Sequence, residues 1–175
     1  TIYFGEGSIE ASALWAASQG FKKPLLVTDK TLVKLGIAKT IQDEYVKQKI
    51  TAVVYDGTHA NPIEEDTIEA ADLYRTSHCD FIIALGGGSP VDVAKIVAIL
   101  ATHPAPLSQY DDAKGGDSLI DGNTLPKIIA IPTTAGTGSE VGRCGVIILK
   151  ETGNKTIFCH PKLLPEVAVL APELT

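Results

Sequence analysis

The sequence predicts an α/β domain, in which a parallel β-sheet carries helices on both faces and is followed by a late β-hairpin. Two observations support this fold class. Four short apolar segments alternate with segments of helical pattern, which is typical of parallel strands joined by helical crossovers. These segments are almost continuously apolar instead of alternating with polar residues, as expected for strands covered on both faces.

The elements follow in order along the chain. The predicted strands are residues 24–29, 52–57, 81–85 and 127–131. The predicted helices are residues 9–18, 39–49, 64–76 and 89–101. For the first helix we expect Ser8 as the N-cap, with Ile9, Leu14 and Trp15 on the buried face.

Two further segments complete the predicted domain. Residues 102–126 are rich in Pro, Gly, Asp and Ser and are expected to form a loop. Residues 146–149 and 155–158 are two apolar runs separated by a Glu-Thr-Gly-Asn turn. This pattern predicts the hairpin.

Composition excludes several classes of function. The 175 residues suit one domain, and a hydrophobic content of 45% excludes a disordered chain. A net charge of −6 argues against a nucleic-acid partner, because such proteins present a basic surface. No polybasic cluster indicates a membrane surface, and no apolar run reaches the roughly 18 residues of a membrane span.

The cysteines and the start of the chain indicate its context. Cys79, Cys144 and Cys159 are odd in number and widely spaced, so we expect no disulfide framework and a cytoplasmic location. The chain begins at Thr1 and contains no methionine. We therefore expect it to be part of a longer protein; the alternative is a small complete protein that has been trimmed.

The strongest motif is a run of three glycines, residues 86–88, between the third strand and the next helix. Glycine allows a sharp turn and a close approach of the backbone to a ligand. Ser89 suits the N-cap and Pro90 the first helical position, so the positive helix end would face an anion. We predict a phosphate-binding turn, which differs from both GxGxxG and the Walker pattern.

A second polar loop, IPTTAGTGSE at residues 131–140, follows the fourth strand. Its hydroxyl groups can donate to phosphate or ribose oxygens, and two loops at strand ends of one sheet can converge on one crevice. Asp29 ends the first strand, where it either accepts from a ribose hydroxyl or caps the next helix. Asn61 and Lys155 are either nucleotide contacts or ordinary turn and surface residues.

Neither a metal site nor a catalytic residue is predicted in this chain. The four histidines lack metal-ligand spacing such as HExxH, and GxSxG is absent. His59 is expected to line the crevice beside Asn61. Cys144, near the second polar loop, either lines a cavity or is a small buried filler, and we favour the filler.

Two motifs resemble the iron-containing (group III) alcohol dehydrogenase family: GGGSPVDVAK at residues 86–95 and IPTTAGTGSEV at residues 131–141. Shorter segments fit the same family in the same order, at residues 3–7, 27–30, 61–62 and 161–175. Within the family, lactaldehyde reductase and the propanediol and butanol dehydrogenases are the most similar. One departure is Ala171, where the family usually has Asp.

The resemblance implies an NAD-dependent enzyme that interconverts small alcohols or diols and aldehydes. Residues 1–175 would form a Rossmann-like, NAD(P)-binding domain, similar to the N-terminal domain of dehydroquinate synthase. A helical domain beyond residue 175 would bind Fe²⁺, a Lewis acid for the substrate oxygen, while hydride passes to or from the nicotinamide. The resemblance also implies a homodimer formed through an edge strand at residues 1–4.

By position, the resemblance implies a set of cofactor contacts. The pyrophosphate region would be contacted by Gly87, Gly88, Ser89 and Asp92. Phosphate and nicotinamide-side groups would be contacted by Thr133, Thr134 and Thr137. The remainder of the site would be lined by Asn61, Val146 and Lys155. Asp29 would contact the adenosine ribose and favour NAD(H), because its carboxylate repels a 2′-phosphate.

Two alternative functions remain open from the sequence. One is a dehydroquinate-synthase-like or glycerol-dehydrogenase-like enzyme domain, which would share the glycine turn and the cofactor fold. The other is a free-standing nucleotide-binding module without catalysis. The IPTTAGTGSE segment favours the alcohol dehydrogenase.

Overall fold

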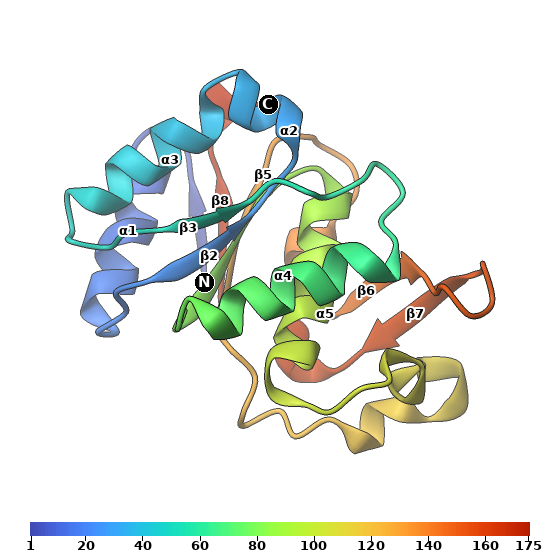
Figure 1. Ribbon diagram of the computed structural model, residues 1–175. Helices are drawn as coiled ribbons and strands as arrows, with labels where there is room; N and C mark the ends of the chain where they lie inside the picture. Colours follow the sequence, from blue (N-terminus) through green and yellow to red (C-terminus); the bar gives the residue numbers. More distant parts are fainter.

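The computed structural model describes residues 1–175 and contains a six-stranded sheet and a separate two-stranded sheet. The six strands are all parallel and lie in the order β1-β8-β5-β4-β2-β3 (Figure 1). Their bounds are β1 Ile2–Phe4, β2 Pro24–Val27, β3 Val53–Tyr55, β4 Phe81–Gly86, β5 Ile128–Pro132 and β8 Val167–Leu170. The predicted parallel sheet is therefore confirmed, and β8 is added to it.

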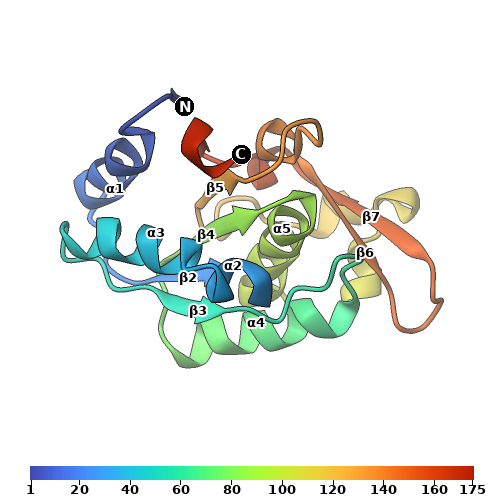
Figure 2. The same cartoon turned by 90° about the horizontal axis from the view of Figure 1, so that it is seen from above.

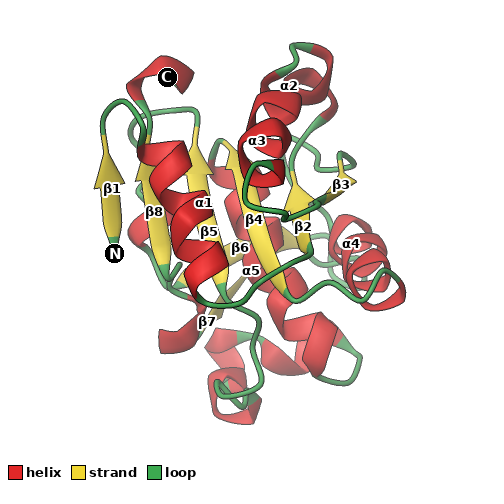
Figure 3. Cartoon of the chain, turned by 90° about the vertical axis from the view of Figure 1, so that its left-hand side faces the viewer, coloured by secondary structure: helices red, strands yellow, loops and turns green.

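Helices cover both faces of this sheet. Their bounds are α1 Ser8–Ser18, α2 Lys30–Lys34, α3 Ile37–Val46, α4 Glu64–Thr76 and α5 Gly88–Thr102. Figure 3 shows α1 and α3 on one face, and α4 and α5 on the other. The neighbouring residues Ile82 and Ile83 of β4 are fully buried in two different hydrophobic cores, one on each face. Burial on both sides explains why the strands read as continuous apolar runs.

A crevice follows from the connections of β2 and β4, which are neighbours in the sheet. The chain leaves β2 for α2, whose Leu32 packs in the core under α1 and α3. It leaves β4 for α5, whose apolar side chains fill the core on the opposite face. Because these connections diverge, the carboxyl ends of β2 and β4 border a crevice, which is where ligands bind in open parallel sheets.

The predicted hairpin is confirmed as β6 Cys144–Ile148 and β7 Lys155–Cys159, paired antiparallel. Figure 2 shows it on the side of α5 that faces away from the sheet. The hairpin register places Cys144 opposite Cys159, and the two form a disulfide. The expectation of unpaired cysteines, with Cys144 as a small filler, is therefore wrong, because strand pairing and not sequence spacing brings the two thiols together. Cys79 is free and buried.

The first helix differs from its prediction in two respects. The N-cap of α1 is Gly7 at φ 79°, and the buried hydroxyl of Ser8 has no hydrogen-bond partner. Leu14 is 49% exposed, whereas Ala13 and Ala16 are fully buried. The prediction holds for Ile9, which is buried, and Trp15 packs partly buried against the same core, but Ala13 and Ala16 take the place of Leu14 on the buried face.

The remaining differences concern bounds and short helices. Helix α3 begins at Ile37, after Gly36 at φ 80°, and ends at Val46, whereas α4 keeps its predicted bounds. Six 3₁₀ helices occur, at Leu107–Tyr110, Asp112–Lys114, Gly116–Leu119, Ser139–Val141, Pro161–Leu163 and Pro172–Leu174. The first three lie in the predicted loop. None of the helices combines the length and the apolar character that crossing a membrane requires.

Candidate functional site

The glycine run makes a sharp turn between β4 and α5. Gly86 adopts φ +141°, and a Cβ there would lie 2.7 Å from Cγ of Pro90 and 3.2 Å from Cδ1 of Leu32. This position therefore requires glycine for both conformation and space. Gly87 follows in extended conformation as the N-cap of α5, so the helix starts at the carboxyl edge of the sheet.

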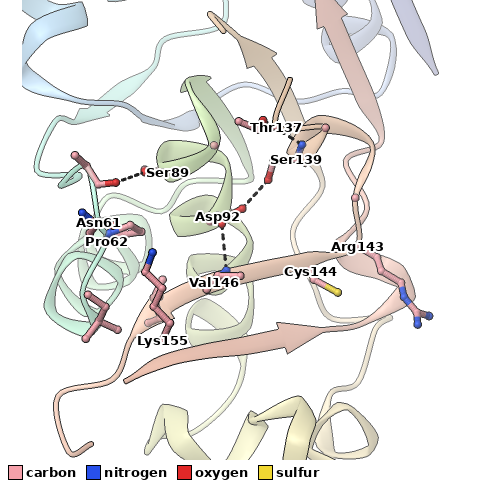
Figure 4. A pocket seen from close by; sticks show the side chains of 16 residues that line it. Asn61, Pro62, Ser89, Asp92, Thr137, Ser139, Arg143, Cys144, Val146 and Lys155 are labelled. Carbon is pink, nitrogen blue, oxygen red and sulfur yellow. Dashed lines mark hydrogen bonds between the residues drawn. The ribbon is translucent and has the colours of Figure 1, made fainter. Parts of the chain in front are cut away.

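The N-terminus of α5 carries no side-chain cap. Ser89 lies inside the first turn, and its hydroxyl donates to the Ala60 carbonyl at 2.7 Å (Figure 4). The prediction that Ser89 is the N-cap is therefore wrong, because Gly87 takes that position. The unpaired N–H groups and the positive end of the helix dipole remain available to an anion.

Two cavities meet at this helix end. The strand-end cavity has a volume of about 660 Å³ and is lined by residues 29–32, 56–60, 87–90 and 133–134. The hairpin cavity has a volume of about 450 Å³ and lies between α5, the second polar loop and the hairpin. Both are lined by Ala60, Gly88 and Ser89. Together they form one groove, hereafter the groove, which crosses the N-terminus of α5.

The structure brings all the sequence-predicted site residues to this groove. The strand-end cavity is lined by Asp29, Gly87, Gly88, Ser89, Thr133 and Thr134. The hairpin cavity is lined by Asn61, Gly88, Ser89, Asp92, Thr137, Val146 and Lys155 (Figure 4). Convergence of the two loops follows from the parallel pairing of β4 with β5, which aligns their carboxyl ends.

Asp29 caps α2 and also lines the groove. Its Oδ1 accepts from the backbone N–H groups of Thr31 at 2.8 Å and Leu32 at 3.0 Å. Both bonds use Oδ1, so Oδ2 stays available in the strand-end cavity. The two readings that the sequence left open, a helix cap and a ribose contact, are therefore compatible in one side chain.

The carboxylate of Asp92 joins three segments around the hairpin cavity. Its Oδ1 accepts from the Ser139 hydroxyl at 2.6 Å, and its Oδ2 accepts from the Val146 N–H at 3.2 Å (Figure 4). Burial raises the pKa of Asp92, and the hydrogen bond from Ser139 opposes that rise. Because both oxygens bond within the chain, this side chain holds the walls of the groove together.

A histidine–carboxylate pair lies at the edge of the strand-end cavity. His59 lines that cavity as expected, and its Nδ1 lies 2.7 Å from Oδ1 of the buried Asp66. Asp66 Oδ2 also accepts from the backbone N–H groups of His59 and Ile63. The sequence signal for this pair is the acidic residue Asp66 in the first turn of α4, but the contact with His59 was not predicted.

The groove contains no recognisable catalytic set of its own. No group of three or more His, Cys, Asp or Glu side chains in residues 1–175 is arranged to hold a metal ion. The polar groups around the groove are backbone amides, hydroxyls, and the side chains of Asp29, Lys30, Asp56, His59, Asn61, Asp92, Arg143 and Lys155. This chemistry suits binding of a phosphorylated ligand more than bond cleavage.

Comparison with known proteins gives a consistent family. Residues 1–172 match the family described as iron-containing alcohol dehydrogenase. The chain is 46% identical over 156 residues to 4-hydroxybutyrate dehydrogenase of Cupriavidus necator. This match covers 89% of this chain and 40% of that protein. It is 34% identical over 176 residues to lactaldehyde reductase of Escherichia coli K12, covering 99% of this chain and 45% of that protein.

A solved structure agrees with the sequence relatives. Sulfoacetaldehyde reductase from Bifidobacterium kashiwanohense, in complex with NAD⁺, matches with a TM-score of 0.89 at 32% identity. The match covers 100% of this chain and 45% of that one. The chain thus spans less than half the length of these relatives.

Proposed function

Because this chain belongs to the iron-containing alcohol dehydrogenase family, we propose that it forms the NAD(H)-binding domain of an enzyme that interconverts small alcohols or diols and aldehydes. The observation that carries the proposal is the groove that crosses the uncapped N-terminus of α5. Such a helix end binds phosphate through backbone N–H groups and the helix dipole. The NAD⁺ in the related sulfoacetaldehyde reductase supports the choice of ligand.

The two cavities suit the two halves of a dinucleotide. We assign the adenosine half to the strand-end cavity, with Asp29 at the ribose, and the pyrophosphate to the turn at residues 87–89. The nicotinamide half then lies in the hairpin cavity, beside Thr137, Val146 and Lys155. The full set of proposed contacts is Asp29, Asn61, Gly87, Gly88, Ser89, Asp92, Thr133, Thr134, Thr137, Val146 and Lys155.

The residues of this chain bind and orient the cofactor. When bound, the nicotinamide accepts or donates the hydride. The N-terminal amides of α5 hold the diphosphate charge, and the ammonium of Lys155 adds a positive group at the hairpin side of the groove. The carboxylate of Asp29 favours NAD(H) over NADP(H), since a 2′-phosphate beside it would bring like charges together.

Iron does not fit the residues of this chain. No three potential ligands among residues 1–175 are grouped to hold it, so we assign no step of the reaction to iron here. We propose that a helical domain beyond residue 175 supplies the Fe²⁺ ligands. The length of the relatives, more than twice the matched segment, supports this arrangement.

We also propose a homodimer and a cytoplasmic location. The edge strand β1 supports the dimer, because Ile2 is 59% and Phe4 78% exposed and an apolar edge strand usually pairs or is covered. The location rests on the composition alone. The Cys144–Cys159 disulfide weighs against it, since disulfides are rare in a reducing cytoplasm.

Calorimetric titration of the 175-residue chain with NADH tests the binding function directly. We expect one binding site per chain and weaker binding of NADPH. Absence of binding at any accessible NADH concentration would overturn the proposal. Sequencing of the coding region beyond residue 175 tests the domain assignment, which requires a helical segment rich in Asp and His.

A further inference from the structure

Lys95 is a fully buried lysine in the middle of α5, with 0% of its surface exposed. Lysine is almost never fully buried unless it is paired with an opposite charge, yet no salt bridge of this ammonium occurs. Its Nζ instead donates to the Ser139 carbonyl at 2.7 Å, the Cys144 carbonyl at 2.8 Å and the Ser139 hydroxyl at 3.3 Å. Three N–H donors thus meet three oxygen acceptors.

These acceptors belong to the two walls of the hairpin cavity. Ser139 closes the second polar loop, and Cys144 is the first residue of β6. One turn earlier on α5, Asp92 bonds to the same Ser139 hydroxyl and to Val146 of β6. The Ser139 hydroxyl therefore accepts from Lys95 and donates to Asp92, which links the two charged residues through one side chain.

The second polar loop has few other attachments. Every hydrogen bond from residues 134–142 to the rest of the chain runs to Lys95 or Asp92. The remaining bonds of this segment are local, such as Val141 N–H to the Gly138 carbonyl. The same segment lines the groove through Thr134 and Thr137. Its position relative to α5 thus depends on two side chains of that helix.

We propose that Lys95 is a positioning residue for the cofactor, whose ammonium holds the second polar loop and β6 in the arrangement that forms the groove. It acts through Ser139 and Cys144 and does not line the groove itself. The expected effect on cofactor affinity rests on the proposed NAD(H)-binding function. The anchoring of the second polar loop and β6 by Lys95 can be measured without any ligand.

The protonation state of Lys95 provides a specific readout. Burial lowers the pKa of Lys95 to about 8, against the opposing attraction of Asp92 and Glu140, the charged groups that face it. Above that pH the neutral amine has only two N–H donors for three acceptors, and its positive charge is lost. Cofactor affinity should therefore fall as the pH rises through about 8.

Stability should respond in the opposite direction. The pKa of Lys95 is lower in the folded chain than its ordinary value of 10.5, so the unfolded chain binds more protons between these two values. The contribution of Lys95 to the free energy of unfolding consequently rises with pH in that window. If Lys95 had only a structural role, NADH affinity would have no reason to fall in the pH range where the free energy of unfolding rises.

The experiment compares the parent with Lys95→Met, which removes the charge at similar length, and Lys95→Arg, which keeps the charge. Lys39→Met is the matched control, since Lys39 lies on the exposed face of α3 with 68% of its side chain accessible. Amide hydrogen exchange without cofactor and NADH dissociation constants from pH 6.5 to 9.5 are measured for each variant, with circular dichroism to confirm folding.

In Lys95→Met we expect faster amide exchange at residues 138–146. We also expect about five- to tenfold weaker NADH binding at pH 7, because the charged hydrogen bonds of Lys95 no longer hold the second polar loop and β6 in place. Lys95→Arg should recover part of this affinity. Parent affinity should fall by a similar factor between pH 7 and 9.5, and this dependence should disappear in Lys95→Met but not in Lys39→Met.

Unchanged exchange at residues 138–146 in a folded Lys95→Met protein would overturn the proposal. If that variant does not fold, a parent affinity that is constant across pH 8 would overturn it equally. If exchange is faster in Lys95→Met but the parent binds no NADH, Lys95 remains the anchor of the loop and the proposed cofactor function is refuted instead.

Discussion

Substitution of Gly87 by valine separates binding from folding. Gly87 has φ −73° and ψ −161°, an extended conformation that valine adopts readily. A Cβ at this position would lie 3.4 Å from Oγ1 and 3.8 Å from Cγ2 of Thr134, which is ordinary van der Waals contact. Glycine is a somewhat better N-cap than valine, so we expect the substitution to cost about 1 kcal/mol of stability.

The effect on cofactor binding should be much larger. The branched side chain would stand at the N-terminus of α5, on the surface where we place the pyrophosphate. A hydrogen bond to a charged group contributes about 1.5–3 kcal/mol, so the loss of one such contact weakens NADH binding by about 10- to 150-fold. Gly86→Ala is the contrasting variant, because its Cβ would lie 2.7 Å from Cγ of Pro90 at φ +141°.

Calorimetric titration with NADH and unfolding by urea together test this reasoning. Gly87→Val should unfold near the parent midpoint but bind NADH poorly, whereas Gly86→Ala should lose stability by about 1–3 kcal/mol or more from backbone strain. Equal NADH affinity in the parent and in a folded Gly87→Val protein would refute the placement of the pyrophosphate.

Three further predictions concern other parts of the chain. Asp29→Asn keeps an oxygen for the cap of α2 but removes the charge. A charge pair at about 4 Å is worth roughly 4 kcal/mol, and a quarter of that energy corresponds to an about fivefold fall in the preference for NADH over NADPH. An unchanged ratio of the two dissociation constants would contradict this prediction. The double variant Cys144→Ser/Cys159→Ser should lower the free energy of unfolding by about 3 kcal/mol, since the disulfide closes a loop of 15 residues. Denaturant titration measures this free energy. Deletion of residues 1–4 should weaken self-association in sedimentation velocity, and an identical profile would count against dimerisation through β1.

Local sequence patterns predicted the strands that are buried on both faces. The segments around β2, β4 and β5 are continuously apolar and end at turn residues, so length and composition identify them. Strand β8 has an equally apolar sequence, VAVL at Val167–Leu170, but it pairs with β1 and β5. The pairing with β1 joins residues more than 160 positions apart, and local patterns carry no information about such partners.

The location of the proposed site could be inferred from backbone features of the sequence, whereas the tertiary contacts around it could not. Glycine runs and hydroxyl-rich loops at strand ends indicate a phosphate site from the sequence alone. The partners of Lys95 arise only when the hairpin packs against α5, and the pairing of Cys144 with Cys159 depends on the register of the two hairpin strands. The same holds for His59 and Asp66, whose contact depends on the entry to α4.

The hydrogen bonds of Asp92 explain how an acidic residue can lie beside the proposed anion site. A free carboxylate there would repel a diphosphate, but both oxygens of Asp92 accept hydrogen bonds from the walls of the groove. The ammonium of Lys95 lies one helical turn further along α5 and interacts favourably with this charge. We therefore propose that the first turn of α5 presents backbone N–H groups to the ligand, while the next turn holds the walls through Asp92 and Lys95. In the proposed function, a single helix would in this way both bind the anion and fix the shape of the site around it.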